Sequence, residues 1–144
     1  MSRRVVITGL GSVCALGVGM DALWQGLLSG ASGLAPMTCL DPGGFRSRLA
    51  GQIPGAFAAR DFVPKHYRKA VKVMARDIEI AVAAAKLAVE DARLTTRGTA
   101  EDVAETAMTY RPERMGCQIG AGFIAAETEE MRVAMATPRD EGGR

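Results

Sequence analysis

The order of hydrophobic and polar residues along the chain predicts two buried strands joined by helices. The β-branched, apolar run at 4–9 is typical of a strand that is buried on both faces. The glycine turn that closes it, at 9–12, allows the backbone to approach another segment closely or to bend sharply. A second strand of this kind is expected at 115–119, followed by a glycine turn at 120–122. A strand, a long crossover with helices and another strand favour an α/β fold with a parallel pair of strands.

Helical periodicity is clearest from Lys69 to Arg93, where apolar residues recur at intervals of three and four. A second apolar row leaves only a narrow charged stripe, so this helix is expected to pack on more than one side. Its many alanines allow a neighbouring segment to come close. A shorter helix is predicted at 22–28, with Asp21 as its N-cap.

Two further segments complete the pattern. Prolines and glycines interrupt residues 34–66, so any helix there is expected to be short. A last helix is predicted from Ile124 to Met135. Because two buried strands make a poor sheet, residues 1–144 are expected to be part of a larger fold.

Composition and charge exclude several classes of function. The chain is 48% hydrophobic and 24% charged with a formal charge of +2, which is globular and too balanced for a nucleic-acid footprint. No apolar stretch reaches the ~18 residues of a membrane span. Three separated cysteines and one histidine predict neither a disulfide framework nor a metal site, and they favour a reducing cytoplasm.

Candidate chemical groups are few. Residues 120–125 fit the GxGxxA pattern of a dinucleotide-binding module, but the acidic residue required ~20 positions later has no strand to carry it. A structural turn is therefore favoured, and no cofactor is expected. Cys117 lies in an apolar run and His66 lies among cations, so a catalytic Cys–His66 pair is not predicted. The charged run 65–72 is interpreted as a solvated helix start, with a minor role in meeting an acidic partner.

Several stretches, in order, resemble the β-ketoacyl-acyl-carrier-protein synthases of fatty-acid and polyketide synthesis. The resemblance covers nearly the whole chain. It is carried by the opening Arg3–Gly11, Leu16-Gly17 and Trp24–Gly33, Asp41–Phe45 and Ala50–Pro54, Glu90–Leu94, and Met115–Gly122. It implies a partial thiolase-like fold, the N-terminal part of an αβαβα layered condensing enzyme.

The resemblance also implies a reaction, which is the decarboxylative Claisen condensation of an acyl thioester with a malonyl unit on acyl carrier protein. Members use a cysteine nucleophile and two histidines, all of which come later than Arg144 in the family's order. No catalytic residue is therefore assigned in this chain, which alone is expected to be inactive. A homodimer is implied. The alternative is a non-catalytic ketosynthase-like partner, such as a chain-length factor.

One substrate-facing position and two departures follow from the resemblance. Gly122 and Phe123 match positions that border the acyl-chain pocket, so Phe123 is expected to restrict acyl length unless it is ordinary core. Arg93 stands where the family commonly has a helix-ending glycine, so a left-handed conformation there would cost roughly 1 kcal/mol unless the cap differs. The segment Thr96–Pro112 is longer than the usual link to the second strand.

Overall fold

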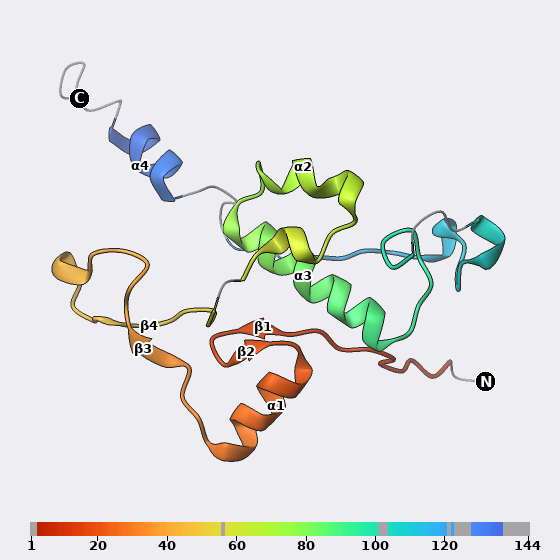
Figure 1. Ribbon diagram of the computed structural model, residues 1–144, viewed down its shortest axis with the longest axis horizontal. Helices are drawn as coiled ribbons and strands as arrows, with labels where there is room; N and C mark the ends of the chain where they lie inside the picture. Colours follow the sequence, from red (N-terminus) through yellow and green to blue (C-terminus); the bar gives the residue numbers. More distant parts are fainter. Residues whose placement is uncertain (1–2, 56, 101–103, 121, 123–127, 137–144) are drawn as a thin grey trace.

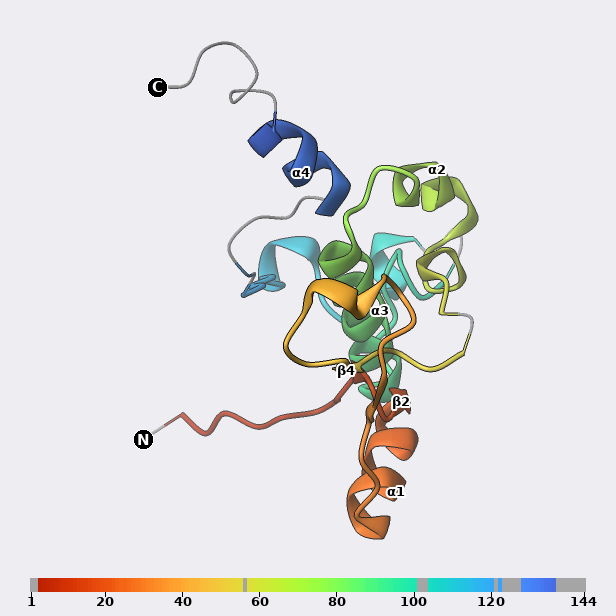
Figure 2. The same cartoon turned by 90° about the vertical axis from the view of Figure 1, so that its left-hand side faces the viewer.

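Helix α3 (Arg76–Asp91) lies at the centre of the molecule. The computed structural model describes residues 3–55, 57–100, 104–120, 122 and 128–136. Helix α2 (Arg68–Val71) lies on one side of α3, and the N-terminal segment and α1 (Met20–Ser29) lie on the other (Figure 1). Helix α4 (Thr128–Ala136) projects from the remaining elements in both views (Figures 1 and 2). The other elements are therefore positioned largely by their contacts with α3.

Helix α1 confirms the short helix predicted at 22–28. Gly19 precedes it, and Asp21 lies inside its first turn instead of at the N-cap, which corrects the predicted cap. A carboxylate in the first turn still interacts favourably with the positive end of the helix dipole. For the last predicted helix, α4 confirms the part from Thr128 onward, and the predicted start at Ile124 lies outside the described residues.

The single helix predicted from Lys69 to Arg93 is wrong, because α2 and α3 are separate helices. At 72–74 the backbone N–H groups donate to carbonyls three residues back, at 3.3, 3.1 and 3.2 Å, instead of four. Ala75 then takes an extended conformation (φ −68°, ψ 159°) and is buried. No glycine or proline marks this break. Helix α2 packs against the turns Ala59–Asp61 and Lys65–Tyr67, and Ala75 is buried at the break, so tertiary contacts override the local helical pattern.

The described residues form two small antiparallel sheets. Strand β1 (Val13–Cys14) pairs with β2 (Gly17–Val18) in a tight hairpin before α1. Strand β3 (Leu34–Pro36) pairs with β4 (Leu49–Gly51), with Leu34 opposite Gly51. The short turns η1 (Pro42–Gly44), η2 (Ala59–Asp61) and η3 (Lys65–Tyr67) confirm that only short helices form in this region.

The predicted parallel strand pair is therefore wrong for the described residues. The segments 4–9 and 115–119 are not strands, and neither joins a sheet. Val5, Val6 and Ile7 are 96%, 74% and 81% exposed. A strand exists only when another strand accepts its ladder hydrogen bonds, and apolar β-branched residues alone do not supply one.

Helix α3 ends in a left-handed residue that is not glycine. Arg93 has φ 53°, and its N–H donates to the carbonyl of Glu90 at 2.9 Å. The next N–H, of Leu94, donates to the carbonyl of Val89 at 3.1 Å. These two bonds form a Schellman cap, which favours glycine at the left-handed position. Helix α1 ends in the same way at Gly30, with φ 65°, so the strain expected at Arg93 is present.

The N-terminal segment packs directly on the backbone of α3. A Cβ atom on Gly9 would lie 2.5 Å from the nitrogen of Ala92, and one on Gly11 would lie 2.6 Å from the nitrogen of Ala88. Only glycine fits at such separations. The close approach expected from the glycines at 9–11 and from the alanines of α3 is thus confirmed. The glycines of the N-terminal segment lie against the alanines of the helix.

The buried core is small. Among the described residues, the buried hydrophobic side chains are Ala59, Ala75 and Ala83, while many large apolar side chains are exposed, including Trp24 at 58%. Within the same ranges, no helix combines the length and the apolar character needed to cross a bilayer.

Candidate functional site

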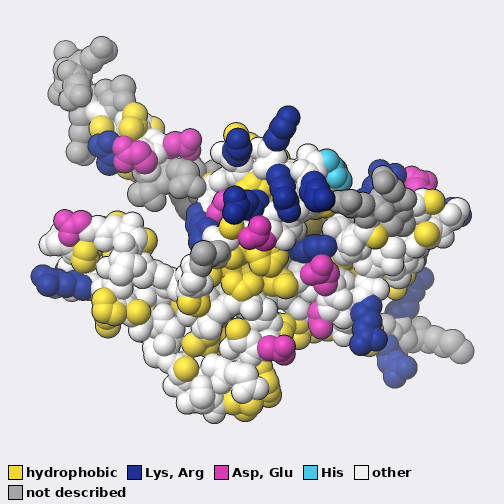
Figure 3. All heavy atoms as spheres, in the orientation of Figure 1, with side chains coloured by type: hydrophobic (Ala, Val, Ile, Leu, Met, Phe, Trp, Pro, Cys, Tyr) yellow, Lys and Arg dark blue, Asp and Glu magenta, His cyan; other side chains and the backbone are white. Residues whose placement is uncertain are grey.

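Four cations form an exposed basic surface on α2 and the turn η3. They are Lys65, Arg68, Lys69 and Lys72, and all four are exposed. Figure 3 shows lysine and arginine side chains gathered over α2. None of the four belongs to an ion pair within the described residues. Because unpaired cations of one sign raise the local positive potential, this surface suits an acidic partner. The helix start predicted at 65–72 is confirmed as solvated.

The thiols and the histidine do not come together as a catalytic pair. His66 is exposed, and its ring lies 4.3 Å from the ring of Tyr67. Cys14 lies on β1, part-buried, within 3.9 Å of the Ser12 hydroxyl. Cys39 and Cys117 are exposed, so the prediction that Cys117 packs in a buried strand is wrong.

The predicted substrate-facing positions are only partly described. Gly122 is exposed, and a Cβ atom placed on it would meet no atom within 4 Å. Phe123 lies outside the described residues, so its predicted effect on acyl length stays a prediction. The role of these two positions in the acyl-chain pocket therefore stays a prediction.

The dinucleotide-binding alternative lacks its structural context. A phosphate-binding GxGxxA turn must follow a strand directly, so that the pyrophosphate meets the helix N-terminus. Residues 115–119, which precede Gly120, form no strand, and Gly120 is as open as Gly122. Across the described residues, no group of three His, Cys, Asp or Glu side chains is arranged to hold a metal ion.

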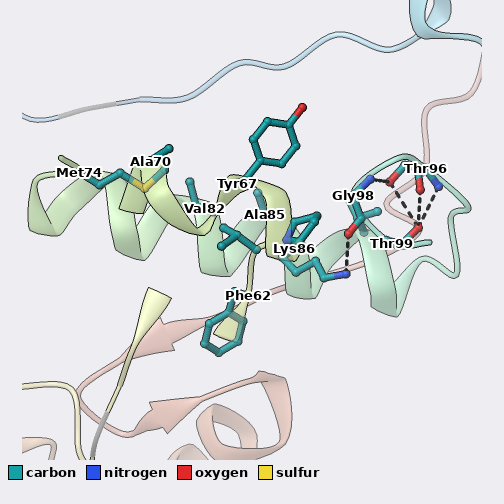
Figure 4. A pocket seen from close by; sticks show the side chains of 13 residues that line it. Phe62, Tyr67, Ala70, Met74, Val82, Ala85, Lys86, Thr96, Gly98 and Thr99 are labelled. Atoms are coloured by element: carbon teal, nitrogen blue, oxygen red, sulfur yellow. Dashed lines mark hydrogen bonds between the residues drawn. The ribbon is translucent and has the colours of Figure 1, made fainter. Parts of the chain in front are cut away.

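A cavity of about 330 Å³ lies between α2 and α3. Its walls come from the segment before α2, from α2 itself, from one face of α3 and from the loop that follows α3 (Figure 4). The lining residues are Phe62, Val63, Pro64, Tyr67, Ala70, Met74, Val82, Ala85, Lys86, Val89, Thr96, Gly98 and Thr99. The sequence did not predict this cavity, because it exists only where the chain breaks between α2 and α3.

The polar end of this cavity is closed by Lys86. Its ammonium donates to the carbonyl of Gly98 at 2.9 Å, as Figure 4 shows, and lies 2.9 Å from a carboxylate oxygen of Glu90. Thr99 secures the same loop: its hydroxyl donates to the carbonyl of Leu94 at 2.9 Å. Lys86 therefore fixes the loop against α3 and is itself held in one position.

Comparison with solved structures shows the class of fold. The chain is similar to a structure described as the ishigamide ketosynthase/chain length factor, with a TM-score of 0.56 and 37% sequence identity. The match covers 66% of this chain and 23% of the other. The fold is therefore of the thiolase-like ketosynthase class.

Comparison at the sequence level then identifies the family. Residues 2–141 match the model of the β-ketoacyl synthase, N-terminal domain, and the chain belongs to this family. It is 33% identical over 130 residues to the granaticin polyketide putative β-ketoacyl synthase 1 of Streptomyces violaceoruber, covering 90% of this chain and 27% of the relative. It is 31% identical over 143 residues to 3-oxoacyl-(acyl-carrier-protein) synthase 2 of Staphylococcus aureus, covering 99% of this chain. The chain thus spans between 27% and 30% of the length of these two relatives.

Proposed function

We propose that this chain is the N-terminal part of a β-ketoacyl-acyl-carrier-protein synthase that performs decarboxylative Claisen condensation. The observation that carries the proposal is the family match across residues 2–141. It is supported by two relatives, one named as a polyketide β-ketoacyl synthase and one as a 3-oxoacyl-(acyl-carrier-protein) synthase, each 33% identical over the aligned 130 and 121 residues. The reaction joins an acyl thioester to a malonyl unit on a carrier protein.

The proposed chemistry depends on the cysteine and the two histidines that follow Arg144 in the family's order. An acyl group is transferred from its thioester to a cysteine thiolate, and the malonyl unit then loses carbon dioxide. The resulting carbanion attacks the acyl thioester carbonyl, a carbon–carbon bond forms, and the cysteine thiolate leaves. Because Cys14, Cys39, Cys117 and His66 form no such site, the 144 residues contribute scaffold and binding surface.

We infer that the carrier protein docks on the basic surface (Lys65, Arg68, Lys69, Lys72). These side chains are exposed and outside the described ion pairs, and they occupy one side of the molecule above α3 (Figure 3). Exposed cations of this kind raise the association rate with an acidic partner, and this effect becomes smaller as the salt concentration rises. A homodimer in the cytoplasm is the assembly proposed for the complete protein.

The second candidate function is a non-catalytic, ketosynthase-like partner. It is favoured by the solved structure that the chain resembles, whose description joins a ketosynthase to a chain-length factor. The two candidates differ in the residue at the later nucleophile position. A synthase has a cysteine there, whereas a chain-length factor forms no acyl-enzyme.

The test is a condensation assay on the protein that includes the region after Arg144. With acyl-carrier protein and labelled malonyl-carrier protein, a synthase releases carbon dioxide and forms a 3-oxoacyl product. The 144-residue chain by itself is expected to form none. If the longer protein neither condenses nor becomes acylated, the chain-length-factor function replaces the synthase.

Docking is tested separately with a charge reversal. Lys69→Glu is expected to weaken carrier binding and to reduce its dependence on salt. Arg48→Glu, on the exposed β3–β4 hairpin, is the matched control and should leave binding unchanged. Equal effects of both variants would show that only net charge matters and not this surface.

A further inference from the structure

The cavity between α2 and α3 has the size of a small-molecule site. Its volume of about 330 Å³ is roughly twice that of the ~150 Å³ engineered cavity that accepts benzene. It falls within the range of ~300 to 1,000 Å³ typical of ligand pockets. Since the ~150 Å³ cavity accepts the six carbons of benzene, about twice that volume leaves room for a linear molecule of about ten carbons.

The cavity walls are apolar along most of their length. Met74 and Ala70 lie toward one end, Val82 and Ala85 lie along the middle, and Lys86 lies at the other end (Figure 4). Tyr67 is 57% exposed at the rim, and Ala70 and Ala85 are also exposed. A ligand can therefore enter from solvent without unfolding of α3, and an aliphatic chain would cover apolar surface that is otherwise in contact with water.

The polar end is balanced in charge. Beyond Lys86, a polar hollow is bounded by Asp61, Glu90 and Arg97. Lys86 pairs with Glu90 at 2.9 Å, Asp61 with Arg60 at 3.7 Å, and Arg97 with Glu105 at 3.0 Å. A charged head group would have to compete with one of these pairs, whereas an uncharged acceptor can use the third N–H of the Lys86 ammonium.

We propose that this cavity binds an uncharged, medium-chain amphiphile, such as an aliphatic ketone, alcohol or ester of about ten carbons. The aliphatic part lies between Met74, Val82 and Ala85, and the head lies at Lys86. The loop that Lys86 holds through Gly98 forms part of the wall, so binding and the order of this loop are linked. The site shares no residue with the predicted acyl-pocket positions, and its test does not depend on condensation.

The test compares three probes with the same chain length in the purified protein. They are 2-decanone, decanoate and decyltrimethylammonium, with binding measured by saturation-transfer NMR and calorimetry. The neutral ketone is expected to bind saturably and at least tenfold more tightly than either ion. Absence of saturable binding, or equal or tighter binding of an ion, would overturn the proposal.

A filled cavity supplies the matched control. Ala85→Trp places a ring inside the cavity and is expected to weaken 2-decanone binding at least tenfold. Ala136→Trp, on the exposed end of α4, is expected to leave binding unchanged. Loss in both variants, or in neither, would overturn the location of the site.

A second variant separates head-group recognition from folding. Lys86→Met keeps the apolar stem and removes the donor, so 2-decanone should bind about fivefold more weakly. Naphthalene, which has no acceptor, responds only to the loosened loop and should lose less binding in Lys86→Met than 2-decanone does. Equal losses for both probes, or no loss for either, would contradict the assigned role of Lys86.

Discussion

The carboxylate of Asp91, the last residue of α3, accepts a hydrogen bond of 2.8 Å from the backbone N–H of Leu10. The two residues are 81 positions apart in the sequence. On either side of Leu10, Gly9 and Gly11 lie against the backbone of α3. One acidic side chain and two glycines thus position the N-terminal segment on the central helix.

Removing this acceptor is expected to loosen the N-terminal segment. Asp91→Ala leaves the Leu10 N–H without its partner, at a cost of about 1 kcal/mol because the bond is exposed. Hydrogen exchange at the Leu10 amide should then be roughly fivefold faster. Asp91→Asn keeps an acceptor oxygen and should show a smaller change. Unchanged exchange in Asp91→Ala would show that the bond contributes nothing.

Adding one methyl group at Gly9 should disrupt the same contact. The new Cβ atom would lie 2.5 Å from the nitrogen of Ala92 and 2.7 Å from the Cβ atom of that residue. Overpacking of this kind costs about 1 to 3 kcal/mol. Urea unfolding measures the loss. Gly116→Ala is the control, since its Cβ atom would meet nothing within 4 Å, and it should change stability by less than ~0.5 kcal/mol.

Replacing Arg93 with glycine should stabilise the end of α3. The left-handed φ of 53° costs an L-residue roughly 1 kcal/mol, and Arg93→Gly removes that cost. The Leu94 amide, which closes the Schellman cap, should exchange about fivefold more slowly after correction for intrinsic rates. Gly30→Ala, at the same left-handed position of the α1 cap, should destabilise that cap, and the Ala31 amide should exchange faster. Faster exchange in Arg93→Gly would contradict the strain.

Acidification should weaken one interaction in α4. Arg132 donates to both carboxylate oxygens of Glu129, at 2.8 and 2.5 Å, which lowers the pKa of Glu129 below its ordinary value of 4.5. A depressed folded pKa means that the stabilisation is present above pH 4.5 and disappears as the pH falls through the lowered value. An NMR titration of the Glu129 carboxyl carbon measures this. In Arg132→Gln the pKa should return toward 4.5, and an identical titration in both proteins would exclude the pair.

The proposed acyl-length limit is tested at Phe123. The resemblance places this ring at the border of the acyl-chain pocket, where a smaller side chain leaves more room. Phe123→Ala in the condensing protein is therefore expected to shift the products toward longer chains. Mass spectrometry of the 3-oxoacyl products measures the distribution. Products of unchanged length would assign Phe123 to ordinary packing.

Features that depend on the local order of residues could be predicted before the structure was known. Periodicity located α1 and most of α3, and the run of cations at 65–72 located the basic surface. The glycines at 9–11 and the alanines of α3 predicted a close approach, because residues without bulky side chains allow backbones to meet. The collinear motifs also identified the family that the comparison confirmed.

Features that depend on contacts between distant segments became visible in the folded chain alone. Residues 4–9 have the composition of a strand, but a ladder requires a second segment, and the described residues place none beside them. The apolar pattern continues through 72–75 without interruption, yet the helix breaks there: Ala75 is extended and buried, and α2 packs against the turns η2 and η3. The cavity and the Lys86–Gly98 contact follow from that break. Local propensity is worth a few tenths of a kcal/mol per residue, so packing between distant segments outweighs it at such points.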